Sequence, residues 1–182
     1  YVLGGRAMMV AYNPEEQRIF SEAAFAASPD FPVLIDRYLS GATEVDVDVV
    51  SDGSKVYIGG VMQHVEAAGI HSGDSACSTP PHTLGEDLLI EIEDACKRIA
   101  IELKVCGLMN VQFAIKNDEV FIIEVNPRAS RTVPFLSKAT GVPLAKIAAK
   151  IAVGETLESQ GLTTRQNQMP WFAIKEAVFP FN

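Results

Sequence analysis

Two runs of strand-forming residues, 110–116 and 120–126, constrain the fold more than any other feature of the chain. Both runs are rich in Val, Ile and Phe, and the turn-forming segment Asn117-Asp118-Glu119 separates them, which predicts an antiparallel hairpin. With a three-residue loop, Gln112 lies opposite Glu124 and Asn110 lies opposite Asn126, so their side chains share one face. The other face is then entirely apolar. Its members are Val111, Phe113, Ile115, Phe121, Ile123 and Val125.

A two-residue loop at Asn117-Asp118 is the alternative register. It would place Gln112 opposite Ile123 and mix polar with apolar side chains on both faces. Because a slip of one residue turns every side chain to the other face, the clean separation favours the three-residue loop.

The polar face of this hairpin predicts a cation site. Gln112, Glu124 and Asn126 offer the oxygen ligands that Mg²⁺ prefers, and Arg128 and Arg131 follow directly in the sequence. Two guanidinium groups beside a divalent cation suit a phosphoryl group in transfer, whose oxygens carry negative charge. The alternative interpretation is a solvated hairpin face with ordinary surface arginines.

The remaining pattern predicts an α+β fold, because hairpins and helices are mixed rather than alternating regularly. In residues 44–50 acids alternate with valines, which predicts a strand with one wet and one buried face. Asp52-Gly53 predicts a turn into a returning strand, and Asn13-Pro14 predicts a helix start. The expected helices are 14–27, 86–106 (ended by Gly107) and 143–153; the other expected strands are 32–39, 55–62 and 171–179, and 63–81 is expected to be a polar loop.

Composition excludes several classes of function. The 182 residues carry 15 basic and 23 acidic side chains, a net charge of −8, which gives no general nucleic-acid footprint. No apolar run reaches the roughly 18 residues that span a bilayer, and no secretory signal opens the chain. Three cysteines without paired spacing favour a reducing compartment, so we expect a cytoplasmic location without membrane or nucleic-acid partners. Because the chain begins at Tyr1, we also expect it to be part of a longer protein.

Two glycine-containing segments add weaker signals. Gly4-Gly5 could present backbone N–H groups to phosphates, or be a plain hairpin turn. The segment 69–75 could close over an anion, with His71 as a hydrogen-bond donor or an acid–base group, or simply be solvated. Cys77 has no partner histidine placed by the sequence, so we interpret it as a structural thiol.

These motifs together resemble a known family. The hairpin, with Asn110-Val111-Gln112-Phe113-Ala114 and Ile123-Glu124-Val125-Asn126-Pro127-Arg128, resembles the metal-binding hairpin of ATP-grasp enzymes. Residues 71–78, together with 2–8 and 137–143, are similar to the large subunit of carbamoyl phosphate synthetase. The amino-acid sequences of residues 4–8 and 71–78 resemble its second, C-terminal half, which phosphorylates carbamate.

The resemblance implies an ATP-grasp fold, with residues 1–40 ending the small lobe with its phosphate flap and hinge, and 41–182 forming the large C-terminal lobe. It implies ATP, Mg²⁺ or Mn²⁺, and K⁺ as cofactors. Carbamate is the implied substrate, in arginine and pyrimidine synthesis, and the other ATP-grasp half and a glutaminase small subunit are implied partners. An absent upstream segment should leave apolar surface exposed or covered by self-association.

The resemblance also implies a role for each site residue. Gln112, Glu124 and Asn126 would hold the divalent cation, and Arg128 and Arg131 would hold the phosphoryl group or carbamate. The adenine hinge would use the backbone of Arg37 and Leu39, the ribose would meet Glu44, and Gly4-Gly5 would form the flap. The nucleotide site would be lined by Gly69, Ile70, His71 and Ser72; the monovalent cation would be held by Glu44, His64 and Ser75.

Three alternatives remain beside this interpretation. One is another ATP-grasp carboxylate–amine ligase with the same hairpin and a different nucleophile. A second is a first-half, carboxyphosphate-forming domain, which the wording of residues 69–78 disfavours. The third is a non-catalytic ATP-binding fragment, which would bind nucleotide without turnover.

Overall fold

The computed structural model describes residues 8–70, 74–162 and 169–178, and the chain divides into two compact units, 1–39 and 40–182. The first unit contains helix α1 (Pro14–Ala27). Asn13 caps the helix by accepting a hydrogen bond from the backbone N–H of Glu16, and the Glu16 carboxylate accepts from Asn13 in return. The first of these bonds satisfies a backbone donor that the first turn leaves without a partner, which confirms the expected helix start.

No side chain of α1 is buried, and the segment after it is irregular. The expectation of a strand at 32–39 is wrong, because these described residues form neither helix nor strand. Phe31, Leu34 and Tyr38 are exposed there. Apolar composition alone does not make a strand, because a strand also needs a neighbour for its backbone hydrogen bonds.

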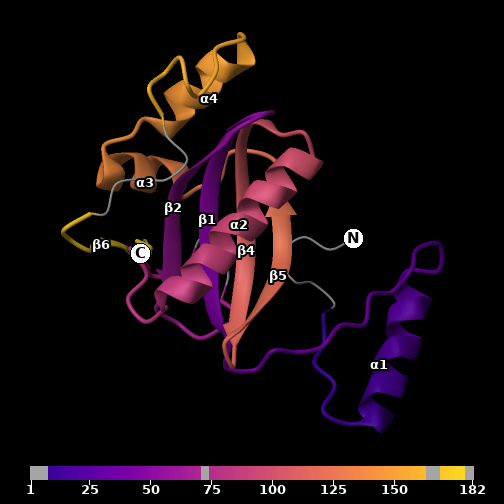
Figure 1. Cartoon of the computed structure of the whole chain (residues 1–182). Helices are drawn as coiled ribbons and strands as arrows, with labels where there is room; N and C mark the ends of the chain where they lie inside the picture. The colour runs from indigo at the N-terminus through magenta and orange to yellow at the C-terminus, as the bar shows by residue number, and fades with distance from the viewer. Residues whose placement is uncertain (1–7, 71–73, 163–168, 179–182) are drawn as a thin grey trace. The chain divides into compact units, whose positions relative to one another are not determined.

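The second unit is built on one antiparallel sheet of six strands in the order β5-β4-β1-β2-β3-β6 (Figure 1). The strands are β1 (Thr43–Asp52), β2 (Val56–His64), β3 (Cys77–Thr79), β4 (Cys106–Lys116), β5 (Glu119–Asn126) and β6 (Ala173–Lys175). The expected turn after β1 is confirmed, with Gly53 at φ +86°. The antiparallel pairing and the separate helices confirm the α+β class.

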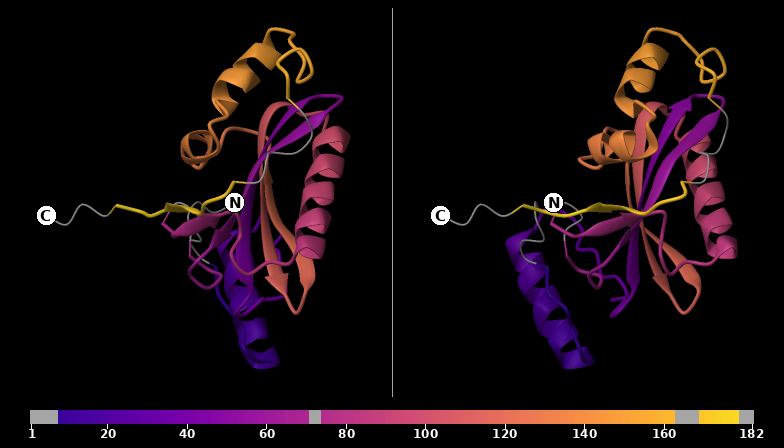
Figure 2. Two further views of the ribbon diagram at one scale, coloured as in Figure 1. Left: turned by 60° about the vertical axis from the view of Figure 1, so that its left-hand side comes forward. Right: turned by 90° about the vertical axis from the view of Figure 1, so that its left-hand side faces the viewer.

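Helices cover the two faces of this sheet unequally (Figure 2). Helix α2 (Glu86–Glu102) packs on one face, where Val47 and Phe113 are fully buried beneath it. Helices α3 (Val133–Thr140) and α4 (Leu144–Ala152) lie on the opposite side and form a second apolar cluster, with Leu136 and Leu144 at its centre. None of the helices in the described part of the chain is both long and apolar enough to cross a bilayer.

The acidic face of β1 is not wet, which corrects the sequence expectation. Asp46 is 2% exposed and Asp48 is 1% exposed. The alternation correctly predicts which side chains share a face, but polar partners from distant segments cover the acidic one.

Other elements also differ from expectation, and among the described residues the strand expected at 171–179 is present only as the short β6. Helix α2 ends at Glu102, and Lys104 takes the left-handed conformation at φ 52°, so Gly107 lies within β4 and does not end the helix. Helix α3 was not expected, and β3 interrupts the segment expected to be a loop.

The β4–β5 hairpin confirms the register at its open end and corrects it at its turn. Asn110 pairs with Asn126 and Gln112 pairs with Glu124, as expected. The turn, however, has two residues, Asn117 and Asp118, both with positive φ, which is the backbone of a type I′ hairpin.

A β-bulge after Gln112 absorbs the difference between the two registers. As a result, Phe113 pairs with Ile122. Ile123 is 56% exposed, so it was wrongly expected on the buried face, whereas Val120 packs against the core beneath α2. Phe121, expected on the same face, is only partly buried and is not among the residues packed there.

Candidate functional site

Polar side chains form rows across one face of the sheet, on the side opposite α2. Opposed residues of antiparallel strands point to the same side, so the pairing fixes these rows. Asp46 on β1 pairs with Gln112 on β4, which pairs with Glu124 on β5. The next row continues from Asp48 through Asn110 to Asn126. The sheet therefore collects carboxylates and amides from three strands in one place.

The end of the hairpin carries the residues expected to hold a divalent cation. Gln112 is half-buried opposite the exposed Glu124, and Asn126 is half-buried in the neighbouring row. The Asn126 side-chain oxygen accepts a hydrogen bond of 3.2 Å from Arg128, whose backbone N–H also bonds the Asn126 carbonyl. The hairpin thus brings one arginine of the pair to the expected ligand set.

This donor set fits a hard cation with bound ligand oxygens. Glu124 supplies one charge, and Gln112 and Asn126 supply neutral amide oxygens. Among the described residues, no three His, Cys, Asp or Glu side chains form a metal-binding group. A cation here would depend on the two amides and on oxygens from the substrate.

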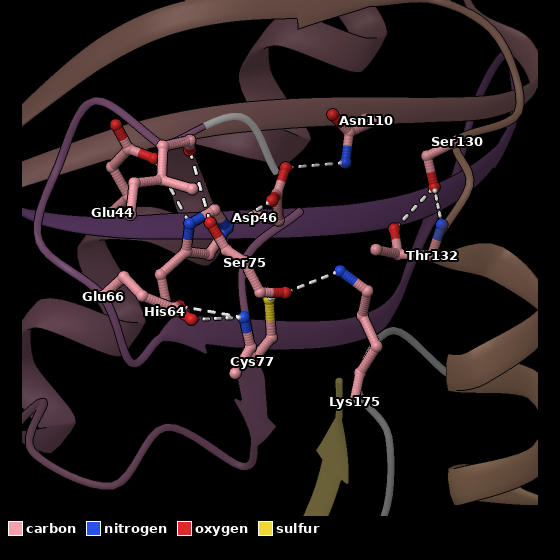
Figure 3. A network of polar contacts seen from close by, with 12 residues as sticks. Glu44, Asp46, His64, Glu66, Ser75, Cys77, Asn110, Ser130, Thr132 and Lys175 are labelled. Atoms are coloured by element: carbon pink, nitrogen blue, oxygen red, sulfur yellow. Dashed lines mark hydrogen bonds and ion pairs between the residues drawn. The ribbon is translucent and has the colours of Figure 1, made fainter. Parts of the chain in front are cut away.

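His64 is held between two carboxylates at the centre of the polar face (Figure 3). Its Nε2 lies 2.7 Å from Asp46, its Nδ1 lies 3.2 Å from Glu44, and the side chain is buried. Burial alone would lower the pKa of His64. The contacts with Asp46, Cys77 and Glu44 act in the opposite direction and raise the pKa to about 11.

The two contacts of His64 bear on the expected monovalent cation site. Both ring nitrogens already face carboxylates, Nε2 that of Asp46 and Nδ1 that of Glu44. A monovalent cation at this place would therefore use oxygen atoms, those of Glu44 and Ser75 among them.

Glu44 connects this centre to the segment expected to meet the nucleotide. Its carboxylate accepts a hydrogen bond of 2.9 Å from the backbone N–H of Gly69. Ser75 donates to the carbonyl of Ile70, and Lys175 of β6 donates to the carbonyl of Ser75 at 2.8 Å (Figure 3). The structure therefore brings together five of the expected residues: Glu44, His64, Gly69, Ile70 and Ser75.

The other expected residues divide into two groups. Gly4, Gly5, His71 and Ser72 lie outside the described residues. Arg37 and Leu39 belong to the first unit, and Arg131 is an exposed residue of the segment after β5.

Several polar residues in this region escaped the sequence analysis. Asp48 accepts hydrogen bonds from Asn110, Ser130 and Thr132, and Glu66 accepts from the backbone of Ala76. The alternation of acids and valines in β1 already indicated that Asp46 and Asp48 share one face. Pairing β1 with β4 in an antiparallel register would have placed both acids opposite the amides of β4.

The fold has a solved counterpart. The structure is similar to the biotin carboxylase domain of a single-chain bacterial carboxylase, with a TM-score of 0.69 and 21% sequence identity, over 91% of this chain and 43% of the other. The mixed architecture and this likeness define an ATP-grasp fold, as the sequence predicted.

Sequence comparison narrows the class to one family. Residues 1–160 match the family described as carbamoyl-phosphate synthase L chain, ATP binding domain, and the chain belongs to it. Carbamoyl phosphate synthase large chains are 55% identical over 182 residues in Vibrio cholerae and 57% over 181 in Neisseria meningitidis serogroup B. That of Methanothermobacter thermautotrophicus is 52% identical over 184 residues. The chain is covered completely in each comparison and spans 17% of the length of each relative.

Proposed function

We propose that this chain binds Mg·ATP as part of the carbamate-phosphorylating, C-terminal half of a carbamoyl phosphate synthase large chain. Membership of the ATP-binding domain family supports the nucleotide. The amino-acid sequences of residues 71–78 and 4–8 support the second half of the large chain over the first. The observation that carries the proposal is the pairing of Gln112 with Glu124, one row from Asn126 and its bonded Arg128.

The divalent cation has a defined role in this proposal. Gln112, Glu124 and Asn126 would hold Mg²⁺ or Mn²⁺, which neutralises phosphate charge when bound. A carbamate oxygen would attack the γ-phosphorus of ATP, and the bond to the bridging oxygen would break to release ADP. Arg128 and Arg131 would stabilise the negative charge that gathers on the phosphoryl oxygens during this transfer.

The remaining residues would bind and orient the nucleotide. Glu44 would accept a hydrogen bond from the ribose, and the backbone at Arg37 and Leu39 would contact the adenine. Gly69 to Ser72 and the flap at Gly4-Gly5 would enclose the phosphates and exclude water, since the product is a labile mixed anhydride. K⁺ would be bound by oxygens near Glu44, His64 and Ser75.

The two units would correspond to the two lobes of the ATP-grasp fold. Residues 1–40 would end the small lobe, and 41–182 would form the large one. In the whole protein we propose the other ATP-grasp half and a glutaminase subunit as partners, in arginine and pyrimidine synthesis in the cytoplasm. The exposed apolar residues of the first unit are compatible with cover from such a neighbour or from self-association.

The first test is Glu124→Ala in the 182-residue chain. We expect Mg²⁺-dependent ATP binding, measured by calorimetry with and without K⁺, to fall below detection, because the only charged ligand of the proposed set is removed. The stability should change by less than about 0.5 kcal/mol, since Glu124 is exposed. Glu119→Ala, at the turn end of the same strand, is the matched control and should bind as the unaltered chain does.

Unchanged Mg·ATP affinity in Glu124→Ala would overturn the hairpin assignment. Where binding is present, ATP consumption with carbamate and with bicarbonate separates the proposed half from a carboxyphosphate-forming domain. Binding without turnover on either would favour the non-catalytic interpretation.

A further inference from the structure

Asp48 is a buried carboxylate whose two oxygens both accept hydrogen bonds from distant segments. Its Oδ1 accepts from the Asn110 side chain at 2.9 Å. Its Oδ2 accepts from the hydroxyls of Ser130 at 2.9 Å and Thr132 at 2.6 Å. Ser130 and Thr132 belong to the segment 127–132, called here the arginine segment, which joins β5 to α3 and carries Arg128 and Arg131.

The arginine segment alternates between exposed arginines and anchored hydroxyls. Arg128 and Arg131 are exposed, whereas Thr132 is buried and Ser130 is half-buried. Ser130 also accepts a hydrogen bond from the backbone N–H of Thr132, and the two hydroxyls lie 2.7 Å apart (Figure 3). The carbonyl of Thr132 accepts from Leu136 in the first turn of α3. Any shift of this segment therefore breaks the buried hydrogen bonds that Ser130 and Thr132 make to Asp48.

A buried carboxylate is a poor way to stabilise a sheet. Removing a charge from water costs several kcal/mol, and an apolar residue at such a position is often as stable or more so. Burial accordingly raises the pKa of Asp48, and the bonds from Thr132, Ser130 and Asn110 act against that rise. The carboxylate instead fixes the positions of its three donors, Asn110, Ser130 and Thr132.

We propose that Asp48 is a positioning residue that holds the arginine segment, and with it the backbone of Arg128 and Arg131, in place beside the polar face of the sheet. Asn110 connects the same anchor to Asp46, because its amide also donates to that carboxylate at 3.3 Å. The effect on phosphoryl binding rests on the proposed function, whereas the anchoring of the segment does not.

The first readout is the order of the segment itself. Trypsin cleaves after Arg128 and Arg131, so its rate at these two sites reports local opening. Asp48→Asn and Thr132→Val should each raise that rate roughly tenfold at a temperature well below melting, because a buried hydrogen bond is lost or weakened. Thr132→Ser keeps the hydroxyl and should restore the slow rate. Thr140→Val removes a hydroxyl from the other end of α3 and is the matched control.

The second readout is the preference for ATP over ADP, measured by calorimetry with Mg²⁺. A displaced pair of arginines should lower ATP affinity while leaving ADP affinity unchanged, so the ratio should fall roughly tenfold in Thr132→Val and recover in Thr132→Ser. A residue with only a structural role would lower both affinities together. Thr132→Val keeps the test usable where Asp48→Asn does not fold.

Each outcome is decisive for one part of the proposal. Unchanged cleavage at Arg128 and Arg131 in both variants overturns the anchoring. Faster cleavage with an unchanged ATP-to-ADP ratio overturns the effect on phosphoryl binding. An unaltered chain with no preference for ATP overturns the role of the arginines in the proposed function, and the trypsin result still decides whether Asp48 holds the segment.

Discussion

The two faces of the central sheet use the same strands in opposite ways. On β1, Val45, Val47 and Val49 point into the apolar core beneath α2, whereas Asp46 and Asp48 point to the other face among amides and hydroxyls. All five of these side chains are buried. The apolar face is stabilised by area removed from water, and the polar face by hydrogen bonds that also fix directions. Burial in this protein therefore marks both the apolar core and the polar network beside the candidate site.

The largest expected effect is on the apolar face. Phe113 is fully buried beneath α2, and Phe113→Ala should lower the free energy of unfolding by about 3–5 kcal/mol, because the cavity cannot fully collapse. Urea denaturation measures this loss. Ile122→Ala is the matched control, because Ile122 pairs with Phe113 across the hairpin and is 53% exposed. Similar losses in both variants would contradict the difference in burial between these two paired residues.

The next effect tests whether the polar face also contributes to stability. Asn110→Ala removes one amide that donates to both Asp46 and Asp48, leaving two buried carboxylates short of a donor. We expect a loss of about 2–3 kcal/mol in the free energy of unfolding, measured by urea denaturation. Glu124→Gln, on the same face but exposed, is the control. A loss below about 0.5 kcal/mol would show that water replaces the amide there.

A smaller effect is expected where α3 meets the sheet. A Cβ added to Gly60 would lie 2.5 Å from Cδ2 of Leu136, whose side chain is fully buried. Gly60→Ala should therefore cost about 2 kcal/mol by overpacking, measured by thermal unfolding. Gly85→Ala meets nothing within 4 Å and should cost less, even though Gly85 caps α2. Equal losses would mean that α3 moves away from the sheet freely.

The smallest loss of stability is expected for Asp52, which lies at the end of β1 and, unlike Asp46 and Asp48, is not fully buried. Desolvation would raise the pKa of Asp52, but bonds from the backbone of Leu157, Lys55 and Ser54 and from the Ser54 hydroxyl lower it to about 2. A folded-state pKa below the unfolded value of about 3.9 contributes stability above that value, which is lost as the pH falls toward 2. Asp52→Asn should cost about 1–2 kcal/mol at pH 7, allowing for partial exposure to solvent.

The pH dependence supplies the check on Asp52. The difference in unfolding free energy between the unaltered chain and Asp52→Asn should narrow as the pH falls from 5 to 3. Asp94→Asn, which removes an exposed ion pair with Lys97, should show little difference at any pH. A difference in unfolding free energy that does not change with pH would mean that the four hydrogen bonds do not depend on the charge of Asp52.

The sequence predicts the part of the site that lies within one hairpin and misses the part that depends on distant partners. The pairing of Gln112 with Glu124 could be predicted because polar and apolar residues separate cleanly along two adjacent runs. The burial of Asp48 could not, since its donors lie 62 to 84 residues away. Helix α3, with eight residues, is too short for its period to stand out.

The β-bulge after Gln112 has a consequence for how this hairpin can vary. It separates the pairing at the open end, which includes Gln112 with Glu124, from the pairing at the turn, which begins with Phe113 and Ile122. A change in loop length at Asn117-Asp118 can be taken up by gaining or losing the bulge without moving the open end. Insertions and tags at the hairpin tip should therefore leave the pairing of Gln112 with Glu124 unchanged. The turn is a suitable place to attach a reporter.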